Sequence, residues 1–280
     1  MPSTQAKITA LREAAETAPE YATLTPLFAA IYSYLQGREG QTGISYNLSA
    51  VNCAQRTAHG FPLISPSEMC LDREKLVSFL MGIVGVLHQQ GTQGEAALDR
   101  IARGLTSEAI DPKPLLLAIL ERRRGPLEEV SLAFDVPAPL LEYLFEIPCK
   151  TSLELFAANF GADAFPGWQE NICPICGARA GMAELVGEEG RRQLCCSACS
   201  YAWPFQRMKC PSCGCEDAEK LSYITAGTGA TRVDTCRNCS RYIKTRDARK
   251  GGSGVPLEVE DLLTIHLDLM ASREGFERGK

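Results

Sequence analysis

Two stretches of the sequence decide the fold of its second half: CPICGARAGMAELVGEEGRRQLCCSACS (residues 173–200) and CPSCGCEDAEKLSYITAGTGATRVDTCRNCS (residues 210–240). Each stretch opens and closes with a Cys-x-x-Cys pair, and between the pairs lie two β-type runs separated by a glycine-containing turn. The predicted hairpins pair residues 182–186 with 191–194, and residues 220–225 with 231–235. A further β-type run follows at 201–208 and again at 241–245. The sequence therefore repeats one small β unit in tandem.

The cysteine pairs indicate metal binding. A Cys-x-x-Cys turn lets two thiolates face one ion, while N–H groups of the turn point at the sulfurs. The glycine after Cys176 and after Cys213 permits the left-handed backbone that such a turn often needs. Two pairs joined by a hairpin supply four soft ligands in tetrahedral geometry, as in zinc ribbons and rubredoxin-type iron sites. Because β units of about 40 residues bury too little surface to fold alone, we expect the metal to contribute to folding.

Consecutive pairs give the simplest ligand assignment. One site takes Cys173, Cys176, Cys196 and Cys199, and the other takes Cys210, Cys213, Cys236 and Cys239. We favour this linear assignment over a crossed one because short hairpins bring consecutive pairs together at little loop-closure cost. Zinc and iron share this ligand set, so the spacing predicts two metal ions without choosing between the metals, or between a structural and a redox role. A thioredoxin-type dithiol is disfavoured, because its cysteine pair opens a helix.

The first half of the chain follows helical periodicity. Apolar residues recur at helical spacing from Leu76 to Leu87, on a segment that begins at Ser67 or Asp72 and ends near Gly91. Further helices are predicted at residues 4–17, 24–35, 95–102, 113–123, 126–134 and 139–159, and a closing helix at 259–270. The predicted class is α+β. An all-α domain at 1–164 precedes one rubredoxin-like or zinc-ribbon unit at 165–208 and a second at 209–280, which includes the closing helix.

Composition and charge restrict the class of protein further. The 280 residues are 45% hydrophobic, enough for two or three folded units, and the formal net charge of -5 gives no general attraction to nucleic acid or anionic lipid. No stretch approaches the roughly 20 apolar residues of a membrane span, and the N-terminus lacks an apolar signal core. Cysteines are odd in number and mostly paired as Cys-x-x-Cys, which favours metal thiolates in a reducing compartment. We therefore expect a cytoplasmic protein.

Several motifs are more specific than metal spacing alone. They are Cys173-Pro-Ile-Cys176-Gly, Leu194-Cys195-Cys196-Ser-Ala-Cys199 followed by Trp203, Arg207-Met-Lys209-Cys210-Pro-Ser-Cys213, Asp234-Thr-Cys236-Arg-Asn-Cys239 with Tyr242-Ile-Lys244, and the closing Glu260-Asp261-Leu262 to Leu267-Asp268 with Gly275-Phe276. In these motifs, over roughly residues 165–278, the sequence resembles the formate dehydrogenase accessory protein (FdhE) family. The helical half resembles that family more loosely, by architecture and length.

The resemblance implies a cytoplasmic, non-catalytic maturation factor for respiratory formate dehydrogenase, a molybdenum or tungsten enzyme with an iron–sulfur cluster. It implies contact with the catalytic subunit of that enzyme before export. It also implies rubredoxin-type iron binding by the eight cysteines assigned above, so iron is favoured and zinc is the alternative. Cys195 and Cys215 are additional thiols outside the core motif.

Other candidate residues carry weaker signals. Cys195 and Cys215 could exchange with a neighbouring ligand or react with a partner's sulfur, although a bystander thiol is the simpler interpretation. Residues that lack metal or catalytic spacing, and are assigned no function, are Cys53, Cys70, Cys149, His59, His88 and His266. The sequence shows no Ser/His/Asp grouping, no phosphate-binding glycine loop and no paired carboxylates, so we do not expect an enzyme.

Basic residues in the second unit support a competing hypothesis, a zinc-ribbon protein that binds nucleic acid. They are Arg232, Arg237, Arg241, Lys244, Arg246, Arg249 and Lys250, with Tyr242 among them. The hypothesis is disfavoured because no series of aromatic residues for base stacking accompanies the charges and the whole chain is acidic. A solvated face, or a docking surface for an acidic partner, is the simpler interpretation. Tyr201, Trp203 and Phe205 alternate like one face of a strand, which is typical of a core.

Overall fold

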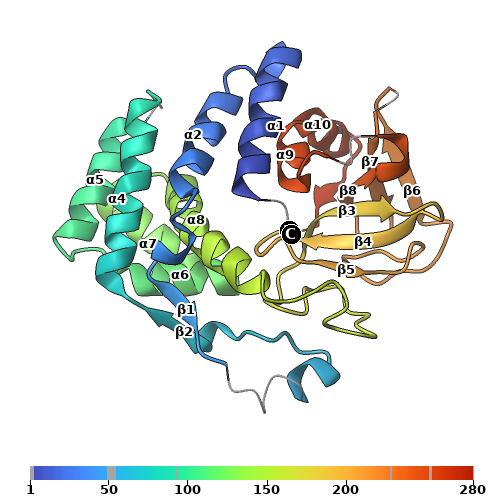
Figure 1. Ribbon diagram of the computed structural model, residues 1–280, viewed down its shortest axis with the longest axis horizontal. Coiled ribbons are helices and arrows are strands. Elements are labelled where there is room, and N and C mark those ends of the chain that lie inside the picture. Colours follow the sequence, from blue (N-terminus) through green and yellow to red (C-terminus); the bar gives the residue numbers. More distant parts are fainter. Residues whose placement is uncertain (1–2, 49–54, 92–93, 228, 252–253, 280) are drawn as a thin grey trace.

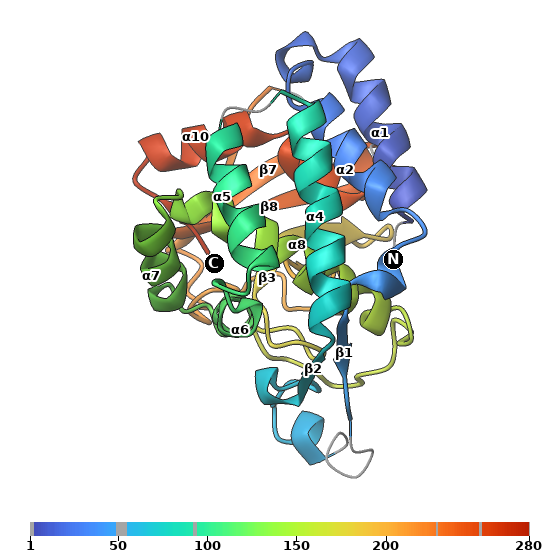
Figure 2. The same cartoon turned by 90° about the vertical axis from the view of Figure 1, so that its left-hand side faces the viewer.

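The computed structural model describes residues 3–48, 55–91, 94–227, 229–251 and 254–279. Helices form the first half and a mixed sheet forms the second, which confirms the α+β class (Figure 1). The long helices of the first half are α1 (Thr4–Thr17), α2 (Thr25–Leu35), α4 (Arg73–Gln89), α5 (Glu95–Thr106), α6 (Pro112–Glu121), α7 (Gly125–Phe134) and α8 (Ala138–Ala157). Turned by 90°, these helices lie in front of the sheet (Figure 2). In the described part of the chain, no helix combines the length and the apolar character that a membrane crossing requires.

Helix α4 shows how the sequence builds the helical half. It begins after Asp72, whose side chain accepts a hydrogen bond from the N–H of Lys75, so Asp72 is the N-cap of the two predicted candidates. The apolar residues that recur at helical spacing are all buried: Leu76, Phe79, Leu80, Ile83, Val84 and Leu87. They pack in one hydrophobic core with residues of α2, α5, α6, α7 and α8. The periodicity therefore predicted both the helix and its buried face.

The expected all-α first half needs one correction. Strands β1 (Ile44–Tyr46) and β2 (Met69–Leu71) form a small antiparallel sheet, in which Ser45 pairs with Cys70. A strand of three residues is too short to show an alternating pattern that stands out from neighbouring loops. The sheet therefore gave no signal in the sequence.

Both predicted hairpins are present. The strands are β3 (Ala180–Val186), β4 (Arg191–Cys196), β5 (Ala202–Pro204), β6 (Leu221–Thr225), β7 (Thr231–Cys236), β8 (Arg241–Asp247) and β9 (Glu277–Arg278). β3 pairs with β4, and β6 pairs with β7, in antiparallel register. The two units are not separate, because β3 also pairs in parallel with β8, with Met182 opposite Lys244. One sheet with the order β5-β4-β3-β8-β7-β6 therefore contains both units, and β9 adds to β8.

The predicted closing helix is two short helices, α9 (Leu257–Leu262) and α10 (Ile265–Arg273). α10 packs Leu267 and Ala271 against Val233 of β7 and Tyr242 of β8. α9 packs Val259 against Leu11 of α1, so the end of the chain connects the sheet to the first helix.

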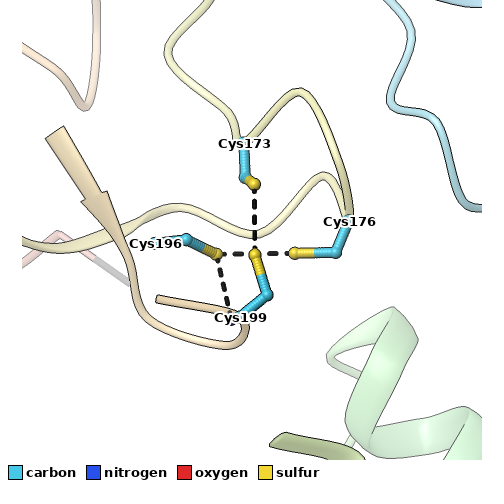
Figure 3. Close-up of side chains that lie close together, drawn as sticks. All are labelled: Cys173, Cys176, Cys196 and Cys199. Carbon is cyan, nitrogen blue, oxygen red and sulfur yellow. Dashed lines mark hydrogen bonds between the residues drawn. The ribbon is translucent and has the colours of Figure 1, made fainter. Parts of the chain in front are cut away.

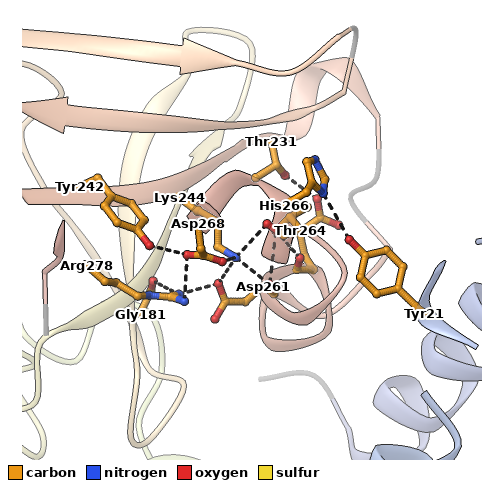
Figure 4. A network of polar contacts seen from close by, with 11 residues as sticks. Tyr21, Gly181, Thr231, Tyr242, Lys244, Asp261, Thr264, His266, Asp268 and Arg278 are labelled. Atoms are coloured by element: carbon orange, nitrogen blue, oxygen red, sulfur yellow. Dashed lines mark hydrogen bonds and ion pairs between the residues drawn. The ribbon is translucent and has the colours of Figure 1, made fainter. Parts of the chain in front are cut away.

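A buried charge network holds these two helices to the sheet (Figure 4). The ammonium of Lys244, which is 0% exposed, lies 2.7 Å from a carboxylate oxygen of Asp261 and 2.6 Å from one of Asp268. Arg278 of β9 faces the same two carboxylates. Tyr242 also donates a hydrogen bond to Asp268. The helices are thus fixed on the sheet by paired charges as well as by apolar contact.

Candidate metal centres

The first four-cysteine group lies where the hairpin of β3 and β4 begins and ends (Figure 3). The Sγ atoms of Cys173 and Cys199 are 3.5 Å apart, and those of Cys176 and Cys196 are 3.4 Å apart. All four sulfurs lie within 4.8 Å of one another. These separations are too long for disulfides, whose S–S bond is about 2.05 Å. Four sulfurs at about 2.3 Å from one tetrahedral ion would lie about 3.8 Å apart, so the group could hold a metal ion.

The local backbone explains why the sulfurs converge. Gly177 adopts φ 72° and its N–H donates to the carbonyl of Cys173, which closes the first turn. In the second turn, the N–H groups of Ala198 and Cys199 both point at the Sγ of Cys196, at 3.3 and 3.4 Å. Ser200, at φ 57°, takes the position that a glycine takes in the first turn. Each turn thus presents two sulfurs to one point, as metal-binding turns do.

The second group repeats this arrangement at the hairpin of β6 and β7. Cys210 and Cys239 have their Sγ atoms 3.8 Å apart, and so do Cys213 and Cys236. This separation equals the tetrahedral value, so the second group could also hold an ion. Gly214 and Ser240 again have positive φ values of 73° and 52°. The structure therefore groups the cysteines in the linear pairing and not in the crossed one.

The two groups differ in their access to solvent. Cys173, Cys196 and Cys199 are buried and Cys176 is half-buried, whereas Cys213 is exposed and Cys239 is half-buried. The second group is therefore the more open of the two.

Electrostatics favours a cation at both groups. Burial raises the pKa of the Cys173 and Cys199 thiols, whereas hydrogen bonds from the neighbouring thiols outweigh burial at Cys196 and lower its pKa. Four thiolates cannot all be charged at one buried point without a cation. Burial also acts to raise the pKa of Cys213, but the N–H of Cys215 and the side-chain amide of Asn238 outweigh it and lower that pKa to about 7. A divalent cation would stabilise all the thiolates.

The additional thiols lie beside the groups and not in them. Cys195 is half-buried, and its Sγ donates to the carbonyl of Ser200 at 3.6 Å. The carbonyl of Cys215 accepts the N–H of Cys210, so this residue helps to close the turn with its backbone. Cys70 is exposed and Cys149 is buried in the helical core. Cys53 lies outside the described residues.

None of the three histidines belongs to either group. His59 bonds through Nδ1 to the carbonyl of Gln55, and His88 lies 3.3 Å from a carboxylate oxygen of Asp99. His266 bonds to the hydroxyl of Tyr21.

The basic residues of the second unit do not form one exposed face. Lys244 is fully buried in the network of Figure 4, and Arg246 is buried against Glu184 of β3 at 2.7 Å. Arg249 pairs with Asp247. The buried cations Lys244 and Arg246 are unavailable to a nucleic-acid backbone, which gives no support to that hypothesis. Tyr201, Trp203 and Phe205 are buried, as their alternation predicted.

Two features next to the first group were missed at the sequence level. One is a cavity of about 940 Å³ between the helices and the sheet, lined in part by Cys176, Cys196, Arg122, Arg179 and Lys150. Its walls come from segments distant in the sequence, so no local pattern could reveal it.

The other feature is a cluster of buried charges that connects the first group to the helices. Lys7 of α1 pairs with Glu154 of α8 at 3.0 Å and with Glu258 of α9 at 2.6 Å. Glu154 in turn accepts a hydrogen bond from Ser200, which adjoins Cys199. The only local signal was a lysine among the buried residues Ile8, Ala10 and Leu11 of α1.

A helical half joined to a sheet whose two hairpins each carry four convergent cysteines defines a protein with two candidate tetrathiolate metal centres. Comparison with known proteins shows which family this chain resembles. The model of the family described as "FdhE, C-terminal domain" matches residues 208–280. The chain is therefore similar to proteins of the FdhE family.

Individual relatives cover more of the chain. A "Protein FdhE homolog" of Aquifex aeolicus is 27% identical over 238 residues, which cover 83% of this chain and 77% of that protein. The protein of the same description from Edwardsiella ictaluri is 34% identical over 121 residues, 42% of this chain and 38% of that protein. The crystal structure of the FdhE protein from Pseudomonas aeruginosa matches with a TM-score of 0.70 at 20% identity, over 99% of this chain and 93% of that one. The last likeness shows that the fold is shared along the whole chain.

Proposed function

We propose that this protein is an accessory factor for the maturation of formate dehydrogenase, acting in the cytoplasm as a metal-binding chaperone and not as an enzyme. The observation that carries the proposal is the pair of four-cysteine groups, placed on the fold of the FdhE family. The similarity to FdhE proteins supplies the link to formate dehydrogenase.

The eight grouped cysteines are the proposed ligands of two metal ions. Their sulfur separations of 3.4–3.8 Å fit one tetrahedral ion at each group. Iron is favoured by the family resemblance, and zinc fits the same ligands. The chain's own residues would hold the ion and surround its sulfurs with N–H donors.

In this proposal, the immature catalytic subunit of formate dehydrogenase contacts the metal-binding sheet where Cys213 is exposed. The helical half helps to hold the subunit. Two features support this arrangement: Cys213 is exposed at the second group, and the cavity next to the first group lies between sheet and helices. A metal–thiolate surface and the helices would then face one partner together.

The test is capture of the catalytic subunit by the tagged, full-length, metal-loaded chain. We expect the wild type to retain the subunit, and the double variant Cys176→Ser/Cys213→Ser to retain much less, because each substitution removes one proposed ligand. Cys70→Ser is the matched control, since Cys70 is an exposed cysteine outside both groups. Failure of the wild type to capture the subunit, combined with binding of RNA or DNA that weakens steeply with salt, would replace this proposal by the nucleic-acid hypothesis.

A further inference from the structure

A second cavity, of about 550 Å³, lies on the sheet next to the second cysteine group. The pleat explains which side chains line it. On β7, Val233 packs against Leu267 of α10, whereas the alternate residues Arg232 and Asp234 line the cavity. Strand register puts Tyr223 of β6 opposite Asp234. The cavity therefore lies on the face of the sheet that α10 does not cover.

Positive charge dominates this cavity. Its basic lining residues are Arg192, Arg207, Lys209, Arg232 and Arg241, and its acidic lining residue is Asp234. Lys209 has a partner in Glu216, at 3.3 Å. Cys210 and Cys236 of the second group also line the cavity, and a divalent ion with four thiolates would carry two negative charges. Most of the charged side chains that line the cavity are thus basic.

Arg192 is the innermost cation of the cavity. Its side chain is 4% exposed, one terminal nitrogen donates to the carbonyl of Lys209 at 3.0 Å, and the other lies 3.6 Å from Asp234. Its Nε is buried and has no hydrogen-bond partner among the described residues. A buried donor without an acceptor is costly, so an anion in the cavity would satisfy a group that the chain leaves unpaired.

Arg232 and Tyr223 form the outer wall. The Nε of Arg232 donates to Asp234 at 2.8 Å, and its guanidinium carbon lies 4.5 Å from the ring centre of Tyr223. Asp234 also accepts a hydrogen bond from Thr245, so its carboxylate is fixed and orients Arg232. Tyr223 is 61% exposed and Met208 is 55% exposed. The rim of the cavity thus offers an aromatic ring and a thioether beside the cations.

We propose that this cavity binds a small phosphorylated molecule, with its phosphate groups on Arg192 and Arg232 and its organic part against Tyr223 and Met208. Guanidinium groups match phosphate oxygens in paired hydrogen bonds, and the charged residues that line the cavity are mostly arginines. The exposed aromatic ring fits a planar organic group. The site lies outside both sets of metal-binding sulfurs.

Calorimetric titration of the full-length, metal-loaded protein tests this proposal. The probes are inorganic phosphate, pyrophosphate, AMP and ADP. We expect one site per chain, with pyrophosphate tighter than phosphate and ADP tighter than pyrophosphate. Arg232→Gln should weaken pyrophosphate and ADP about tenfold or more, because a charge-assisted hydrogen bond is lost. Tyr223→Ala should weaken ADP and leave pyrophosphate unchanged.

The matched control is Arg191→Gln. Arg191 precedes Arg192 on β4, is exposed, and points to the other side of the strand. It should not change the affinity for any probe. Two results would overturn the proposal: no binding of any probe at millimolar concentration, or binding of a glutamate-rich peptide without binding of phosphates. Loss of metal from the Arg232→Gln variant, with unchanged affinity for the phosphate probes, would also overturn it. The cations would then stabilise the metal-binding thiolates and not a phosphate.

Discussion

Replacement of Lys244 by Met tests the charge network that fixes α9 and α10 on the sheet. Lys244 is fully buried, and its ammonium contacts Asp261, Asp268 and the backbone carbonyl of Asp261 at 2.6–2.7 Å. Removing one partner of a buried ion pair typically costs about 3–5 kcal/mol, because the other charge is left uncompensated. Arg278 still faces both carboxylates, which are themselves 29% and 21% exposed. We therefore expect Lys244→Met to lower the free energy of unfolding by about 3 kcal/mol, the lower end of that range.

Urea denaturation of the metal-loaded protein, followed by the fluorescence of Trp168 and Trp203, measures this loss. Lys220→Met is the control, because Lys220 forms an exposed pair with Asp217 and such a pair contributes about 1 kcal/mol or less. The double variant Lys244→Met/Asp268→Asn should regain part of the stability, since it removes one of the carboxylates left without a partner. A loss below about 1 kcal/mol for Lys244→Met would refute the reasoning, because the network would then contribute no more than a surface pair.

The remaining predictions concern metal release, acid and packing. A chelator should remove the ion of the second group before that of the first, because Cys213 is exposed while three cysteines of the first group are buried. A colorimetric assay of the released metal should then show two phases, and release of both ions at equal rates would contradict the prediction. Glu258→Gln should destabilise the protein above about pH 4.5, and the difference from wild type should shrink as the pH falls towards 2. Burial acts to raise the pKa of Glu258, but Lys150 and Lys7 outweigh it and lower that pKa to about 2, so its stabilising charge is lost as the pH falls through that value. Acid denaturation of both proteins measures the difference, and a constant gap from pH 6 to 2 would count against the ion pairs. Gly82→Ala should lower the free energy of unfolding by about 1–3 kcal/mol, because the new Cβ would lie 2.1 Å from the hydroxyl of Tyr34. Gly85→Ala, in the same helix, places its Cβ in open space and should leave the thermal stability unchanged or raise it. Equal effects of the two substitutions would show that the contact with Tyr34 is relieved at no cost.

Local patterns predicted the cysteine groups and both hairpins. Cys-x-x-Cys spacing fixes two sulfurs within one turn, and a short hairpin brings the next pair to the same point, so Cys173 and Cys199 could be assigned together from the sequence. The helical half could be predicted for the same reason, because the buried face of α4 repeats every three or four residues.

Contacts between distant segments could not be predicted. The parallel pairing of β3 with β8 joins the two units, and it depends on which strand edges meet after folding. Arg246 illustrates the consequence: in the sequence it belongs to a basic run, but its partner Glu184 lies 62 positions away and buries its charge. The ion pairs of Lys244 and Lys7 could not be predicted for the same reason, since their carboxylate partners lie on other elements. The cavity with Arg192 likewise requires the sheet before its lining residues can be recognised.

The metal content of the protein, purified without oxygen, tests the central claim most directly. Elemental analysis should find two equivalents of iron or zinc per chain, and an optical spectrum should show thiolate charge-transfer bands if the metal is iron. Cys176→Ser and Cys213→Ser should each remove one equivalent, whereas Cys70→Ser should remove none. A fully folded wild-type protein without bound metal would contradict the claim that the eight sulfurs form two metal centres.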